Sequence, residues 1–208
     1  YYQQALDIYD RTVSRYHPSV GNTLFNLGLA YRRLKRWDEA TASIMQALEV
    51  FERAHGSEHA SVARALNSAS NLYARVQQWD KAVDALRRAL TIFERTLGPN
   101  HPRLAHVLGN LGLLEMYRGR YDQGRIAFER ALSVVAAQDT VDRAKRALFT
   151  MRLGRAYFGM GDRAAARAAL RRAQAEGDAV SPALHAEILS WLDRVDASAR
   201  GDTHDDSG

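Results

Sequence analysis

Cysteine is absent from this chain of 208 residues. Without a thiol, the chain can form neither a disulfide framework nor a thiolate metal site. No stretch approaches the run of about 18 apolar residues that a membrane-spanning helix needs, and no secretory signal is visible at the amino terminus. We therefore expect a cytoplasmic protein. Methionine is missing from the first position, so Tyr1 is expected to be either a cut point inside a longer protein or the first residue left by processing.

The motifs of common catalytic sites are also missing. The sequence has no Gly-rich phosphate loop, no nucleophile elbow and no pair of carboxylates in a plausible cleft. His55 and His59 are four residues apart, as in a helical zinc site, but Gly56 breaks a helix between them. No cysteine or further histidine completes a ligand set. We predict no enzyme activity, no metal and no cofactor, and we assign the histidines to turns.

Lysine is scarce, although the chain is basic. The net charge is +5 and the isoelectric point is about 9.7. Nearly all of the positive charge is arginine, since the only lysines are Lys35, Lys81 and Lys145. A basic chain can attract nucleic acid or acidic peptides, but solvated surface arginines would give the same composition. A nucleic-acid-binding surface therefore stays open as an alternative, which the salt dependence of binding would test.

A repeat of 42 residues runs through most of the chain. The segment from Ser61 to Pro102 aligns without gaps with the segment from Ser19 to Ala60 and with the segment that begins at Arg103. A fixed period of this size is typical of stacked helical repeats rather than of one globular core. The aligned positions include Trp37, Trp79 and Tyr121; His17, His59 and His101; and Ala47-Leu48, Ala89-Leu90 and Ala131-Leu132.

The repeat register predicts the organisation of the chain. The second helix of a truncated repeat covers 1–16, full repeats cover 17–60, 61–102 and 103–144, and a degenerate repeat covers 145–178. A helix over 181–197 is expected to cap the array, and the polar tail over 198–208 is expected to be disordered. Because the first helix lacks its repeat partner, self-association through this helix is a further hypothesis.

Each repeat is expected to be a pair of helices. In the first full repeat, one helix runs from Pro18 to about Leu34 and the next begins near Trp37. Gly56 is suited to end the second helix in a left-handed conformation. Gly28 lies in mid-helix, where it costs about 1 kcal/mol relative to alanine, so we expect a neighbouring helix to approach closely there. In the third repeat, Glu115 occupies a position that is aromatic in the first two.

The pattern L-G-x-x-Y, then W/Y-D-x-A, then A-L resembles the tetratricopeptide repeat. Its usual length is about 34 residues. The longer repeat here, together with A-L-x-I-F-E-R-x-L-G-P-N-H-P over 89–102, is similar to the kinesin light chain subclass. The resemblance covers residues 1 to about 178. It implies an all-α, right-handed superhelix of antiparallel helix pairs that serves as a scaffold for binding proteins and peptides.

The resemblance also implies where a partner binds. In this family the first helix of each repeat lines the concave face and contacts extended peptides. Carried over position by position, the candidate peptide-binding residues are Asn22, Asn26, Arg33, Arg64, Asn67, Asn71, Arg75, His106, Asn110, Arg152 and Arg155.

Asparagine and arginine dominate this set, and no acidic residue belongs to it. An asparagine amide both donates and accepts, so it can pair with a peptide backbone, and arginine matches a carboxylate. We expect a non-enzymatic module that binds an extended segment with acidic side chains or a free carboxyl terminus. The alternative is that these residues are solvated and bind nothing. We also expect the chain to be the sensing or recruiting part of a larger bacterial signalling or regulatory protein. The family's carboxylate clamp, Lys/Arg-x3-Asn, is not fully matched, since the corresponding pairs are Asn22/Asn26, Arg64/Ser68 and His106/Asn110.

Overall fold

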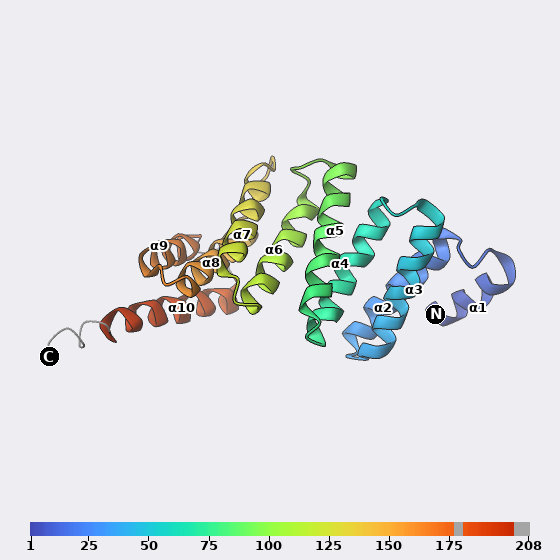
Figure 1. Cartoon of the computed structure of the whole chain (residues 1–208), viewed down its shortest axis with the longest axis horizontal. Helices are drawn as coiled ribbons and strands as arrows, with labels where there is room; N and C mark the ends of the chain where they lie inside the picture. The colour runs from blue at the N-terminus through green and yellow to red at the C-terminus, as the bar shows by residue number, and fades with distance from the viewer. Residues whose placement is uncertain (177–180, 202–208) are drawn as a thin grey trace. The chain divides into compact units, whose positions relative to one another are not determined.

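The computed structural model describes residues 1–176 and 181–201, and all regular structure in these residues is α-helical (Figure 1). The ten helices in this part of the chain confirm the predicted all-α class. They group into two compact units, Tyr1–Pro99 and Asn100–Gly208. Among the described helices, none combines the length and the apolar character required to cross a bilayer.

The first unit, residues Tyr1–Pro99, contains five helices. Helix α2 packs against α3, α3 against α4, and α4 against α5, while α1 makes a smaller contact with α2. The helices follow each other in chain order from blue to green in Figure 1. Their bounds are α1 Tyr2–Thr12, α2 Pro18–Arg33, α3 Trp37–His55, α4 Ala60–Arg75 and α5 Trp79–Leu97.

The second unit, residues Asn100–Gly208, contains the other five helices. Helix α6 packs against α7, α7 against α8, and α8 against α9, and α10 packs mainly on α9 with a smaller contact to α8. Ile188 and Val195 of α10 are fully buried in a core that includes Met151 and Leu170. The bounds are α6 Pro102–Tyr117, α7 Tyr121–Ala136, α8 Arg143–Gly159, α9 Arg163–Gln174 and α10 Pro182–Gly201.

The helix ends differ from the predicted ones in two places. Helix α1 stops at Thr12 instead of continuing to residue 16, because Val13 leaves the helix in an extended conformation. Helix α8 begins at Arg143, where the Asp142 carboxylate caps it by accepting a hydrogen bond from the Lys145 N–H at 2.9 Å. Helix α10 continues to Gly201, so the predicted start of a disordered tail at residue 198 came too early. Residues 202–208 and the predicted end of the fourth repeat at residue 178 lie outside the described residues.

Close contact between the two helices of a repeat explains the mid-helix glycines. A Cβ atom at Gly28 would lie 2.7 Å from Cγ1 of Ile44, and one at Gly154 would lie 2.8 Å from Cγ of Leu170. Contacts this short do not occur between carbon atoms in folded proteins, so a side chain at either position would push the helices apart. The expected close approach at Gly28 is therefore present.

The recurring histidine of the repeat is a helix N-cap. The Nδ1 atoms of His17, His59 and His101 each accept a hydrogen bond from the backbone N–H two residues later, at 3.2 Å. The first N–H groups of a helix have no partner within it, so a side-chain acceptor stabilises the helix start. This arrangement explains the histidine at period 42 without a metal or a catalytic role.

The turn between the helices of each repeat contains one residue with a positive φ angle. That position is occupied by Lys35 (59°), Gln77 (57°), Gly119 (74°) and Gly161 (84°), again at a spacing of 42 residues. Glycine adopts such angles without a steric penalty, whereas lysine and glutamine do not. The first two turns are therefore more strained than the last two.

Glu115 is buried in the second unit, with 1% of its surface exposed. Its carboxylate lies 3.4 Å from Nη1 of Arg118, whose side chain is also mostly buried. Burial of a lone charge is costly, and a nearby opposite charge offsets much of that cost. The acid at this normally aromatic position is thus part of a local ion pair.

Candidate functional site

Helices α2 and α4 carry most of the candidate residues of the first unit. Asn22 and Asn26 are one turn apart on α2, and Asn67 and Asn71 are one turn apart on α4. Residues four apart share a helix face, so each helix presents a pair of amides. Asn22, Asn26 and Asn71 are exposed, and Asn67 is half-buried. We call these four residues, together with Arg33, Arg64 and Arg75, the amide surface.

Arg64 links the two helices of the amide surface. Its Nη2 donates a hydrogen bond to Oδ1 of Asn22 at 2.8 Å. Its guanidinium lies over the Phe25 ring, 4.6 Å from the centroid, and 5.6 Å from the Phe51 centroid. Stacking on an aromatic face stabilises a guanidinium. Arg64 therefore helps to hold α4 against α2 and α3, which the sequence alone did not indicate.

Asn71 and Asn26 differ in which side-chain hydrogen-bonding groups they leave available to a partner. Asn71 donates its Nδ2 to the main-chain oxygen of Asn67 at 3.0 Å, and Ser70 donates to the same oxygen at 2.8 Å. The Oδ1 of Asn71 is thereby left as an acceptor. Asn26 is exposed and makes no side-chain hydrogen bond with any described residue. A peptide backbone needs both a donor and an acceptor, and these two side chains supply them.

Arg33 and Arg75 occupy equivalent positions at the ends of α2 and α4. Arg75 lies over the Trp37 ring, with Cζ 3.7 Å from the centroid. Arg33 is exposed, and its side chain forms no hydrogen bond, ion pair or ring contact with a described residue. Of these two predicted binding residues, Arg75 is already stacked within the fold, whereas Arg33 extends into solvent.

In the second unit the candidate residues lie on α6 and α8. Burial, followed by the positive charge of Lys145, lowers the pKa of His106, and Asp142 partly opposes this shift. Arg155 donates to Oε1 of Glu187 at 3.2 Å. The predicted set contained no acid, but α10 places Glu187 beside one of its arginines. Sequence reasoning missed Glu187 because it treated α10 only as a cap.

Arg152 lies one turn before Arg155 on α8. Its side chain is partly buried, and it forms no hydrogen bond or ion pair with any residue that the structure describes. Burial and the positive charge of Arg155 lower the pKa of Arg152, while Glu187 and Tyr117 act in the opposite direction. Arg152 is therefore a partly desolvated cation that lacks a direct counter-ion within the described residues.

Beside Arg155, the second unit contains a cavity of about 320 Å³, which we call the aromatic cavity. Its walls come from α6, α8, α10 and the start of α7, and four of its lining side chains are aromatic. Trp191 packs edge-on against Phe158 with centroids 5.9 Å apart, and the Arg155 guanidinium lies 4.9 Å from the Trp191 centroid. The lining residues are Leu113, Met116, Tyr117, Tyr121, Arg155, Phe158, Gly159 and Trp191.

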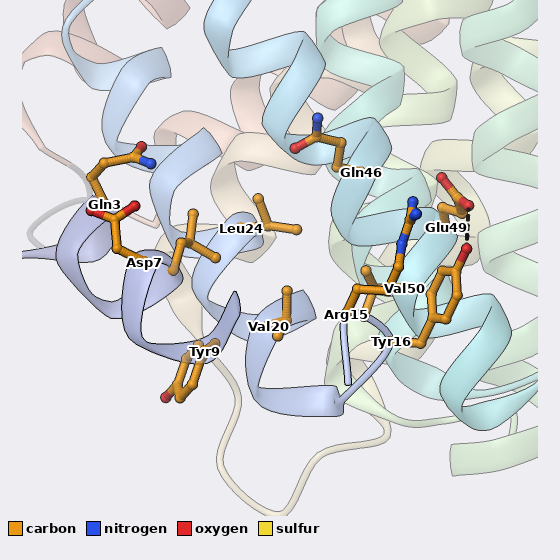
Figure 2. Close-up of a pocket in the computed structure, with 11 residues that line it drawn as sticks. Gln3, Asp7, Tyr9, Arg15, Tyr16, Val20, Leu24, Gln46, Glu49 and Val50 are labelled. Carbon is orange, nitrogen blue, oxygen red and sulfur yellow. Dashed lines mark hydrogen bonds between the residues drawn. The ribbon is translucent and has the colours of Figure 1, made fainter. Parts of the chain in front are cut away.

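A second cavity, of about 420 Å³, lies in the first unit between α1, α2 and α3 (Figure 2). Val20, Leu24 and Val50 give it an apolar wall, and Tyr16 reaches Oε1 of Glu49 at 3.5 Å. None of the predicted binding residues lines this cavity. Figure 2 shows polar side chains from α1 and α3 around it, including those of Gln3, Asp7 and Gln46.

The histidine pair that resembled a zinc site is stacked. The rings of His55 and His59 have centroids 4.2 Å apart, and burial, followed by the charge of His59, lowers the pKa of His55. Within residues 1–176 and 181–201, no group of three or more histidine, cysteine or acidic side chains could hold a metal ion.

The helix pairs and the exposed faces of their first helices define a helical-repeat protein of the interaction-scaffold class. The tetratricopeptide repeat model matches residues 1–42, 26–95, 61–133 and 104–175. The chain belongs to the tetratricopeptide repeat family, which confirms the resemblance in the sequence. Proteins of this family are generally non-enzymatic scaffolds for protein–protein interaction.

Solved structures that share this fold include kinesin light chain-like repeat proteins. BtubC (BKLC) from P. vanneervenii is 26% identical, with a TM-score of 0.78 over 84% of this chain and 70% of that chain. A putative kinesin light chain from Podosopora anserina with nearly identical TPR-like repeats is 23% identical, with a TM-score of 0.73 over 84% and 82%. The apo form of RapI is 13% identical, with a TM-score of 0.74 over 85% and 62%. No curated protein sequence matches the chain.

Proposed function

We propose that this chain is a non-enzymatic interaction module whose amide surface binds an extended, acidic segment of a partner protein. The main supporting observation is the paired amides of α2 and α4. Two of their exposed members, Asn26 on α2 and Asn71 on α4, offer donors and acceptors to a partner, whereas Asn22 already accepts a hydrogen bond from Arg64. Such groups can pair with a main chain regardless of its side chains.

The charges near these amides favour an acidic partner. Arg33 extends into solvent beside α2, and Arg75, although stacked on Trp37, remains exposed. An exposed guanidinium can form a two-point contact with a carboxylate. The same charges accelerate the encounter with an acidic segment at low ionic strength. A surface that binds without performing chemistry fits the sensing or recruiting part of a larger signalling or regulatory protein.

A peptide array with graded acidity tests this proposal. Binding of the best extended acidic peptide should weaken at least tenfold in Asn26→Ala and in Asn71→Ala. Both residues are exposed, so neither change should lower the melting temperature. Arg64→Ala is a poorer test, because it also removes the contacts to Asn22 and Phe25. Thr91→Ala on α5 is the control, since this exposed side chain bonds only to its own helix.

Two results would contradict the proposal. Peptide binding that both asparagine variants retain would place the binding surface elsewhere. Preferential binding of an oligonucleotide, with affinity that falls steeply as salt rises, would favour the nucleic-acid alternative, because phosphate contacts release counterions.

A further inference from the structure

Helix α1, at the outer end of the first unit (Figure 1), exposes a face that the other repeats bury. It corresponds to the second helix of a repeat, because Tyr2, Ala5 and Ile8 align with positions of α3 at a shift of 42 residues. Tyr2 is 43% exposed and Ile8 is 59% exposed. On α3, which α2 covers, the equivalent residues are the buried Ile44, Ala47 and Val50.

Within the described residues, α10 lacks a second helix of its own. It packs on α9 and α8, as the first helix of a further repeat would, and it is the last helix in this part of the chain. Its inner face, which includes Ile188 and Val195, is fully buried. Its outer face is exposed and forms a shallow depression, lined by Ala186, Leu189, Ser190, Asp193, Arg194 and Ala197.

Small residues mark the surface through which each first helix contacts its second helix. Two positions seven residues apart carry only glycine, alanine or serine, and all of these residues are buried. A Cβ atom at Gly21 would lie 3.0 Å from Cγ1 of Val50, so the small residue allows α3 to approach α2 closely. The four pairs are Gly21 and Gly28, Ala63 and Ser70, Ala105 and Gly112, and Ala147 and Gly154.

The same spacing of small residues occurs on the outer face of α10. Ser190 and Ala197 are seven residues apart, and both are exposed. An antiparallel helix would therefore reach α10 as closely as α3 reaches α2. If the packing of α2 on α3 is taken as the template, Ser190 lies opposite the position of Ile8, and Ala197 lies opposite the position of Tyr2.

We propose that α10 of one chain docks antiparallel on α1 of a second copy of this chain, and that the two helices complete one repeat between them. The choice of partner follows from continuity with an interface that the fold already uses, since the contact reproduces the packing of α2 on α3. The two docking faces differ, so the contact is heterologous and the chains associate head to tail. This inference goes beyond the proposed function and does not involve the amide surface.

The two faces favour a weak association. Asp193 and Arg194 lie beside the small residues of α10, and the Arg194 guanidinium is 4.7 Å from the centroid of the Trp191 ring. Covering charged groups costs part of their hydration. Stable interfaces bury roughly 1,200–2,000 Å², and a single pair of helices is a small contact. We therefore expect assembly that depends on concentration rather than a permanent oligomer.

Sedimentation velocity with two single variants tests this proposal. The average mass of the unmodified chain should rise with concentration and exceed that of a dimer. Ile8→Lys blocks the α1 face and Ser190→Lys blocks the α10 face, so each variant alone should stay monomeric over the same concentrations. Both positions are exposed, so neither change should lower the melting temperature. Ser133→Lys is the matched control, because it adds the same charge at an exposed position of α7, and it should associate like the unmodified chain.

A mixture of the two variants distinguishes this contact from other modes of association. The Ile8→Lys chain keeps an intact α10 face and the Ser190→Lys chain keeps an intact α1 face, so the mixture should form dimers and nothing larger. The proposal is wrong if the unmodified chain stays monomeric at every concentration, if either variant associates by itself, or if the mixture remains monomeric. Association that Ser190→Lys retains and Ile8→Lys loses would mean that two α1 helices pair with each other. None of these outcomes bears on peptide binding at Asn26 and Asn71, so the proposed function is tested separately.

Discussion

Arg75 of α4 lies over the ring of Trp37, with its Cζ 3.7 Å from the ring centroid. Trp37 begins α3, so the contact joins one repeat to the next. The contact stabilises the fold because a guanidinium is attracted to the face of an indole ring. A residue that the repeat pattern assigns to ligand binding thus also joins two repeats.

Substitution of this arginine should measure the strength of the contact. Arg75→Ala should lower the free energy of unfolding by about 0.5–1 kcal/mol, as expected for an exposed cation on an aromatic ring. Arg33→Ala is the matched control, because Arg33 has the same place in the repeat and stacks on no ring of the described residues. Urea denaturation of both variants checks the prediction. An equal effect at the two positions would show that the stacking contributes nothing.

The turn with a positive φ angle offers a stabilising substitution. Gln77→Gly should raise the free energy of unfolding by up to about 1 kcal/mol, because glycine adopts this conformation without steric strain. Gly119→Ala should lower it by a similar amount. Gln78→Gly is the control, since its φ angle of −82° gives glycine no advantage. A melting temperature that falls in Gln77→Gly would contradict the strain argument.

The N-cap role of the histidines predicts how substitutions at a helix start change the stability of the protein. His101→Ala should cost about 1 kcal/mol of stability, because the N–H of Arg103 loses its acceptor. His101→Asn should restore most of the loss, since asparagine is a favoured N-cap residue. Arg103→Ala keeps the cap and should cost little. Thermal unfolding distinguishes these outcomes, and equal losses from alanine and asparagine would argue against capping.

The repeat register explains how much could be predicted from the sequence. Residues such as His17 and Ala47 recur at a fixed spacing because each repeat packs in the same way, so the helix pairs and the family followed from the period. The aromatic cavity, in contrast, is formed in part by residues that depart from that period. Gly159 replaces an arginine, and Trp191 belongs to a helix outside the repeat. Their effect arises from contacts with Tyr121 and Arg155, which no spacing in the sequence encodes.

Acidification should weaken the fourth repeat through Glu176. This carboxylate lies 2.7 Å from Nε of Arg146 and 3.3 Å from Nε of Arg143. The bond to Arg146, followed by that to Arg143, holds the pKa of Glu176 below its ordinary value of 4.5, although burial acts in the opposite direction. The charged form is therefore favoured in the folded state. Its contribution to stability is complete above pH 4.5 and is lost as the pH falls through the lowered pKa.

Glu176→Gln should accordingly reduce the melting temperature at pH 7, and the difference from the unmodified protein should shrink as the pH falls below 4.5. Glu58→Gln is the control, because both partners of the Glu58–Arg95 pair are largely exposed and such pairs contribute little. It should cause only a small change across the same pH range. Melting curves between pH 3 and pH 7 provide the measurement. A Glu176→Gln difference that stays constant down to the lowest pH would mean that the arginines do not stabilise the charged carboxylate, and that the loss at neutral pH arises from packing alone.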